Sequence, residues 1–227
     1  MAMDIVKKAY QDFPIRRIVA SVTDKPGLAE FIREIPTVET IVSSGGTEKY
    51  LRENLSDTNI EIIGVEAFTG VPEGLGGRVK TLHPKVHAAI LADRLNPAHQ
   101  DYLHEIGVPW QFDMAIVGLY QFEKAVAQGL PYNETTEQID IGGPTILEGA
   151  AKNAPNIIPL HFPFHVDTAQ SQLTNQGTIP LHGRLLLAGW TMKDVAKYRA
   201  ANDAYMNGVP MAEKIASYDV IPFPKNR

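Results

Sequence analysis

The residues of this sequence best suited to chemistry lie in a loop bounded by glycine and proline. The stretch Gly76-Gly77-Arg78-Val79-Lys80-Thr81-Leu82-His83-Pro84 joins two cations, a hydroxyl and an imidazole. If the segment is extended, Arg78 and Lys80 point to the same side, because alternate residues of an extended chain share a face. Such a pair suits an anionic small molecule; the alternative is two exposed, solvated cations and a histidine that starts a structural turn.

Three other loops combine small residues with hydroxyl, amine or carboxylate groups. They are Ser21-Val22-Thr23-Asp24-Lys25-Pro26-Gly27, Ser43-Ser44-Gly45-Gly46-Thr47 and Ile139-Asp140-Ile141-Gly142-Gly143-Pro144. In each, small residues let backbone N–H groups approach an anion, and the positive end of a following helix adds to the attraction. The second loop also fits a plain strand-to-helix turn with a threonine cap. Since no loop carries the Gly-Lys-Ser/Thr or Gly-x-Gly-x-x-Gly fingerprint, a mononucleotide or sugar phosphate fits better than a dinucleotide.

Two pairs of histidines are spaced four residues apart, as half of a metal site would be. They are His83 with His87, and His161 with His165. Pro84 and Pro163 argue against a regular helix through either pair, and neither pair has an acidic residue placed nearby as a third ligand. The sequence therefore predicts no metal.

The composition bounds the class of protein. A chain of 227 residues can bury one substantial core, and a formal charge of −5 argues against a generally basic nucleic-acid surface. The absence of cysteine excludes disulfides and thiolate chemistry and fits a cytoplasmic protein. No stretch approaches the roughly 20 apolar residues of a membrane span, and the N-terminus lacks an apolar signal region. We expect neither nucleic acid nor membrane as a partner.

Hydrophobic patterns predict strands alternating with helices. Apolar runs predict strands at 17–22, 40–43, 60–65, 114–119 and 157–160, and helical spacing predicts helices near 28–35, 47–54, 97–106, 144–153 and 185–206. Residues 66–84 read as a long ordered loop and 161–182 as an extended crossing segment. This order predicts an α/β fold, a parallel twisted sheet flanked by helices with a C-terminal helical extension. We expect one domain at 1–160, with 161–227 packed on it, and ligands at the carboxyl ends of the strands.

The motifs arrive in an order that resembles a known family. They are Ser-Val-Thr-Asp-Lys-Pro-Gly-Leu, Ser-Gly-Gly-Thr, Gly-Arg-Val-Lys-Thr-Leu-His-Pro-Lys-Val-His, Leu-Tyr-Gln-Phe and Ile-Asp-Ile-Gly-Gly-Pro-Thr, followed by Ala-Ala-Lys-Asn. Over residues 15–157 the chain is similar to the inosine monophosphate (IMP) cyclohydrolase domain of the bifunctional purine biosynthesis enzyme. The resemblance implies the methylglyoxal-synthase-like, Rossmann-like fold of that domain, here without the transformylase domain.

The same resemblance implies ring closure of 5-formamidoimidazole-4-carboxamide ribonucleotide (FAICAR) to IMP with loss of water, without cofactor, metal or folate. By similarity, the catalytic residues are Lys80, Tyr120, Asp140 and Lys152. The substrate-binding residues are Ser21, Lys25, Ser44, Gly45, Gly46, Thr47, Arg78, Thr81, Gly118, Ile141, Gly142 and Gly143. Family members are dimers, so a homodimer is expected, and a separate transformylase would supply the substrate.

The side chains suit that chemistry. Asp140 would accept the amide proton, and Lys80 and Tyr120 would donate toward the formyl oxygen. Lys152 would hold Asp140 ionised, but it lies about two and a half helical turns beyond the Gly142-Gly143 turn, so the fold or a neighbouring subunit must bring it back.

The sequence also departs from the family pattern. Gly118 and Gln121 stand where the family has Asn and Pro, and Ala88-Ala89 replaces a Gly-Gly pair. The loss of the Asn side chain removes a hydrogen bond to the substrate. A different, purine-like substrate is therefore an alternative to FAICAR. Two alternatives remain, both on the same fold. One is a non-catalytic module that binds a purine nucleotide for regulation, and the other is a lyase like methylglyoxal synthase.

Overall fold

A parallel sheet forms the centre of the protein. The computed structural model describes residues 5–72, 74–77, 79 and 81–221. Within them, five strands pair in the order β3-β2-β1-β4-β5, and every pairing is parallel. The strands are β1 (Arg17–Ser21), β2 (Thr40–Ser43), β3 (Glu61–Gly64), β4 (Met114–Val117) and β5 (Ile158–His161). The predicted α/β class, with its long C-terminal helix, is confirmed.

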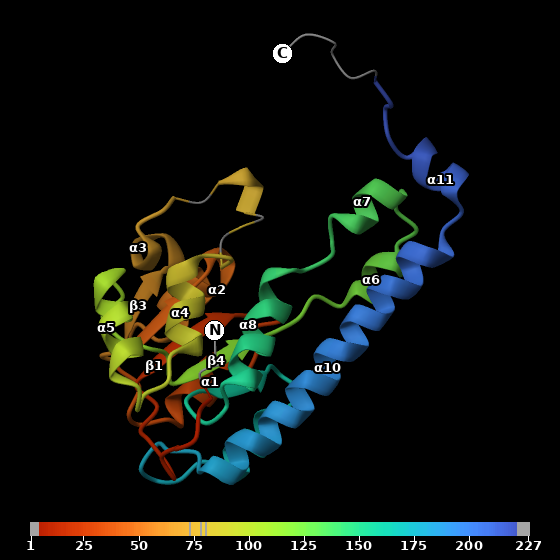
Figure 1. Cartoon of the computed structure of the whole chain (residues 1–227). Helices are drawn as coiled ribbons and strands as arrows, with labels where there is room; N and C mark the ends of the chain where they lie inside the picture. Colours follow the sequence, from red (N-terminus) through yellow and green to blue (C-terminus); the bar gives the residue numbers. More distant parts are fainter. Residues whose placement is uncertain (1–4, 73, 78, 80, 222–227) are drawn as a thin grey trace. The chain divides into compact units, whose positions relative to one another are not determined.

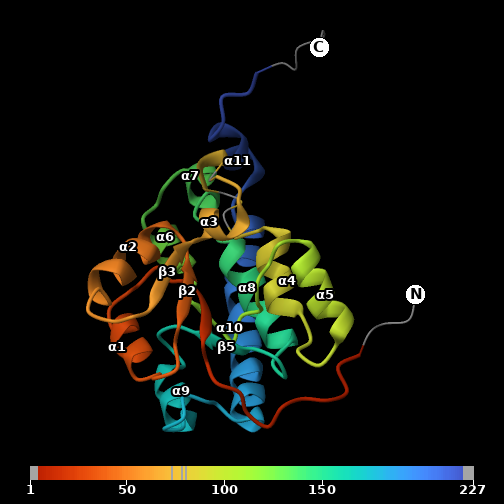
Figure 2. The same ribbon diagram turned by 90° about the vertical axis from the view of Figure 1, so that its left-hand side faces the viewer.

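Helices cover both faces of the sheet, as Figure 2 shows. One face packs on α1 (Leu28–Arg33), α2 (Gly45–Asn54) and α9 (Val166–Gln172). The other packs on α3 (Val65–Thr69), α4 (Pro84–Leu91), α5 (Pro97–Glu105) and α8 (Gly142–Lys152). All four residues of β2, of β4 and of β5 are buried, as expected for strands of a parallel sheet that is covered on both faces.

Three expectations about local structure are wrong. The predicted loop 66–84 contains most of α3 and a short 3-10 turn, η1 (Leu75–Gly77), and the extended segment 161–182 contains α9. Helix α4 begins at Pro84, with Nδ1 of His83 accepting a hydrogen bond from the Lys85 N–H at 3.2 Å. Proline is tolerated at the first helical position because its missing N–H has no partner there, so Pro84 starts the helix that it was expected to prevent.

The chain forms two compact units. The first consists of residues 1–119 and 141–195, and the second of residues 120–140 and 196–227. The long helix α10 (Leu181–Gly208), labelled in Figure 1, contributes residues to each. The predicted division at residue 160 stays a prediction.

Arg184 links the N-terminal segment of the chain to the rest of the first unit. Its side chain is fully buried and donates to the carbonyl oxygens of Tyr10, Gln11, Ala154, Pro155 and Ile179. Burial, with a smaller effect from the charge of Arg94, lowers the pKa of Arg184 to about 10. The guanidinium thus holds three chain segments that are far apart in sequence.

The second unit consists of short helices joined by aromatic contacts. It contains α6 (Phe122–Ala127), α7 (Tyr132–Thr136), the end of α10 and α11 (Met211–Ala216). The Tyr205 ring packs edge-on against Phe122 at 5.5 Å and stacks on Tyr132 at 5.8 Å. No helix in the described part of the chain is both long enough and apolar enough to span a membrane.

Candidate functional site

The strand order points to the carboxyl edge of the sheet as the candidate ligand site. Because β1 lies between β2 and β4, the chain reverses its direction of travel across the sheet there. Open parallel sheets bind ligands at such a switch point, beyond the carboxyl ends of the strands. Ser21 ends β1, and the Gly118 N–H, one residue after β4, donates to the Ser21 carbonyl at 3.0 Å.

The loops after β1 and β2 interlock at this edge. The hydroxyl oxygens of Ser21 and Ser44 lie 3.1 Å apart. Thr47 is buried, and its hydroxyl both accepts from the Val22 N–H and donates to the Val22 carbonyl, each at 2.9 Å. The Thr47 side chain therefore braces the end of β1 against α2, and its hydroxyl is already engaged.

A lysine lies beside the N-terminus of α2. A Cβ built on Gly46 would be 3.9 Å from Nζ of Lys25, which also donates to the Thr23 carbonyl at 3.0 Å. The first N–H groups of a helix have no partner within it, and the helix dipole is positive at that end. An ammonium beside such a terminus forms an electropositive corner suited to a phosphate. Ser21, Lys25, Ser44, Gly46 and Thr47 are thus brought together, as expected of one anion-binding loop pair.

Gly118 lies where backbone segments approach closely. A Cβ at this position would lie 3.1 Å from Cγ1 of Val22 and 3.3 Å from both the Thr23 nitrogen and the Phe162 carbonyl oxygen. Two of these three atoms belong to the backbone and cannot move without shifting a loop. The absence of a side chain therefore lets the loops after β1 and β5 close around the end of β4.

The predicted residues of the third loop separate along α8. Gly142 and Gly143 open this helix, and Ile141 precedes it with 61% of its surface exposed. Lys152 is exposed at the other end of α8, about 15 Å away along the helix axis at the usual rise per residue. The helix thus carries Lys152 away from its own Gly142-Gly143 turn, and the role of this lysine stays a prediction.

The remaining predicted residues do not gather within one unit. Tyr120 and Asp140 are the first and last residues of the 120–140 segment of the second unit. Tyr120 is half exposed, and the Asp140 N–H donates to the Tyr198 hydroxyl at 2.6 Å. Thr81 is buried in the first unit.

Two predicted residues, Lys80 and Arg78, lie outside the described residues. Each therefore stays a prediction from the sequence.

The histidine pair at the end of β5 has an acidic partner that the sequence did not indicate. Nδ1 of His161 lies 2.8 Å, and Nε2 of His165 3.1 Å, from the same carboxylate oxygen of Asp194. The expectation that no acidic residue accompanies this histidine pair is wrong, because Asp194 comes from α10, thirty-three residues beyond His161. Among the described residues, no group of three or more potential ligands is arranged to hold a metal ion.

Comparison with known proteins identifies the family. The profile described as "MGS-like domain" matches residues 27–145, which is more than half of the chain. The chain therefore belongs to the MGS-like domain family, in agreement with its sheet order and with the resemblance seen in its motifs.

Individual relatives show which members of the family this chain is similar to. The bifunctional purine biosynthesis protein PurH of Mycobacterium marinum is 39% identical over 202 residues, which cover 88% of this chain and 38% of that protein. PurH of Bacillus subtilis is 33% identical over 215 residues, covering 94% of this chain and 41% of the relative. The chain thus spans about two fifths of the length of these curated relatives. A solved structure titled "Crystal structure of ForH" superposes with a TM-score of 0.65 at 28% identity, covering 83% of this chain and 97% of that one.

Proposed function

We propose that this protein is an IMP cyclohydrolase, which closes the second ring of FAICAR to form IMP with release of water. The observation that carries the proposal is the similarity to PurH, a purine biosynthesis protein, along 88% to 94% of this chain. The electropositive corner made by Lys25 and the start of α2 supports it, because the substrate is a ribonucleotide monophosphate.

In the proposed reaction, one group of residues binds the ribose phosphate and another transfers protons. Ser21, Lys25 and the backbone of Gly45 and Gly46 hold the ribose phosphate in this proposal, while Thr47 fixes the loop geometry through Val22. Asp140 accepts a proton from the carboxamide nitrogen as that nitrogen bonds to the formyl carbon. Lys80 and Tyr120 donate toward the formyl oxygen, which leaves as water while the formamide nitrogen loses its own proton and forms the new C=N bond.

The protein acts as a homodimer in this proposal. The distance along α8 between Gly142 and Lys152 supports that element, since Lys152 reaches a carboxyl-edge site more readily from a second copy. A separate transformylase supplies the formylated substrate.

The test is an ultraviolet assay of purified protein with FAICAR, following formation of the hypoxanthine ring. Lys80→Ala should lose most of the turnover at saturating substrate, by on the order of 10² to 10⁴-fold, because it removes a positioned donor. Lys85→Ala, at the start of helix α4 in the same region, is the matched control and should keep normal turnover.

Tight binding of IMP without turnover would contradict the enzyme and favour the regulatory module. Equal turnover in the two lysine variants would contradict the assigned role of Lys80.

A further inference from the structure

We infer that His161 is an additional substrate-contacting residue, which accepts a hydrogen bond from an N–H group on the heterocyclic end of the nucleotide. The inference rests on the proposed function for the identity of the ligand. Its structural basis is the position of His161 on the sheet and the state of its two ring nitrogens.

The position follows from strand register. Ser21 pairs with Val117, and Val117 pairs with His161, so the three residues lie side by side across β1, β4 and β5. Neighbouring strands are about 4.8 Å apart, which puts His161 about 10 Å from Ser21 along the carboxyl edge. A nucleotide whose phosphate lies at the loops after β1 and β2 can reach β5 with its base by lying along that edge.

The surroundings place His161 on the face of the sheet where α8 begins. Val117, its neighbour in register, packs in the core under α4 and α8. Helix α8 leads into β5 and runs antiparallel to it, so the Gly142-Gly143 turn lies at the same carboxyl edge. His161 therefore shares a face and an edge with the turn that the sequence predicts to bind substrate.

The two ring nitrogens of His161 differ in their hydrogen bonding. An ionised carboxylate can only accept hydrogen bonds, so in the neutral tautomer that pairs with Asp194 the ring proton of His161 lies on Nδ1. Nε2 is then an acceptor. It is buried and has no hydrogen-bond partner among the described residues, on a residue that is only 6% exposed. Buried polar atoms of this kind are uncommon, and an N–H of a ligand would satisfy this one.

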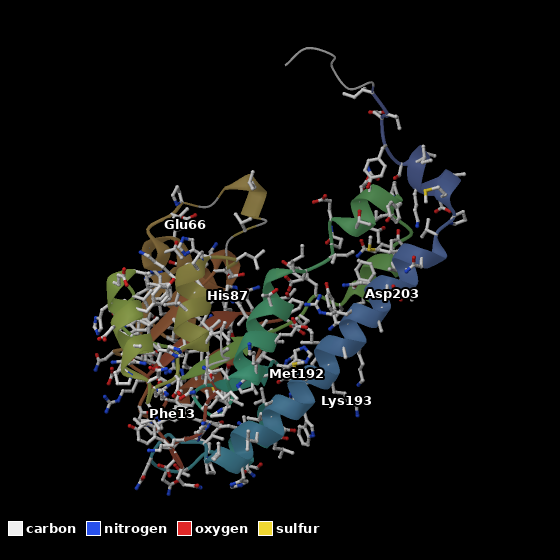
Figure 3. All side chains as sticks on the ribbon, in the orientation of Figure 1. Phe13, Glu66, His87, Met192, Lys193 and Asp203 are labelled. Carbon is white, nitrogen blue, oxygen red and sulfur yellow. The ribbon has the colours of Figure 1, made fainter. Side chains whose placement is uncertain are left out.

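Asp194 and an aromatic ring hold the imidazole in place. Asp194 follows Met192 and Lys193, which are labelled on α10 in Figure 3, and its carboxylate oxygen also contacts His165. The Phe164 ring packs at 4.9 Å from the His161 ring and is itself 65% exposed. The imidazole thus contacts a carboxylate at Nδ1 and packs against a largely exposed aromatic ring.

Calorimetric binding of two probes to the full chain tests the assignment. IMP carries the heterocycle with its N–H, and ribose 5-phosphate lacks it. His161→Asn keeps an N–H near the Nδ1 position for Asp194 but loses the Nε2 acceptor. It should weaken IMP binding by on the order of tenfold while leaving ribose 5-phosphate binding unchanged.

Two further variants separate contact from structure. His161→Gln places an amide oxygen near the Nε2 position and should recover much of the lost IMP affinity. His165 contacts the same carboxylate through Nε2, a position that the amide nitrogen of Gln can take, so His165→Gln should change the binding of neither probe.

IMP affinity that His161→Asn leaves unchanged, or equal weakening of both probes, would overturn the assignment of His161 alone. Wild-type protein that binds ribose 5-phosphate but not IMP would overturn the proposed function as well.

Discussion

Two buried threonines provide a sharp test of how the edge of the sheet is held. The hydroxyl of Thr47 makes two hydrogen bonds with the backbone of Val22, whereas the hydroxyl of Thr191 has no partner among the described residues. Thr191 is 0% exposed and Thr47 is 3% exposed. Replacing either threonine by valine preserves the shape of the side chain and removes one hydroxyl. The two variants therefore differ in whether the lost hydroxyl made hydrogen bonds.

The expected effects differ in size and in sign. Thr47→Val leaves the buried N–H and carbonyl of Val22 unpaired, and each such group costs about 1 to 3 kcal/mol. The carbonyl is the less costly of the two, so we expect a loss of about 2 to 4 kcal/mol in the free energy of unfolding. Thr191→Val removes a buried polar atom that makes no bond, so it should leave stability unchanged or increase it by up to about 1 kcal/mol.

Urea unfolding measures both variants. With a slope of about 2 kcal/mol per molar urea, Thr47→Val should lower the unfolding midpoint by about 1 to 2 M. Thr191→Val should give a midpoint equal to or above that of the wild type. If the two variants shift the midpoint equally, the hydroxyl of Thr47 does not brace β1 and the reasoning is wrong.

Two further predictions concern Gly118 and His87. Gly118→Asn should lower both stability and turnover, because its Cβ would lie 3.3 Å from backbone atoms of Thr23 and Phe162; a urea midpoint equal to wild type would contradict this crowding. Burial lowers the pKa of His87 below 6.5, against a smaller opposing effect of a hydrogen bond to the Thr81 backbone. Below pH 6.5 His87 therefore binds a proton in the unfolded chain but not in the folded protein. The free energy of unfolding should fall as the pH drops from 6.5 toward the lowered pKa. His87→Gln should lose less stability between pH 7 and pH 5, and equal losses in urea midpoint would refute the assignment.

The strands could be predicted from the sequence because each contains a short apolar run that includes β-branched residues. The run at 40–43 coincides with β2, and the others begin or end within two residues of the observed strand. The parallel arrangement followed from their alternation with helices, and it placed the glycine-rich loops at one edge. The position of the loops after β1 and β2 at that edge could be predicted for the same reason.

The parts that the sequence did not predict depend on short helices and distant contacts. Helices α3, α6, α7 and α9 have five to seven residues, too few for a hydrophobic period to stand out. The contact of His161 with Asp194 requires α10 to return to the sheet, which no local pattern signals. The crowding at Gly118 likewise depends on Phe162, forty-four residues further along the chain.

The most direct test of the proposed function is the identity of the product formed by the wild-type protein from FAICAR alone, with a chelator present and no folate. Mass spectrometry should show a nucleotide lighter than the substrate by one water, with the ultraviolet spectrum of IMP. Unchanged substrate after prolonged incubation with folded protein would contradict the proposal that this member of the MGS-like domain family is a cyclohydrolase.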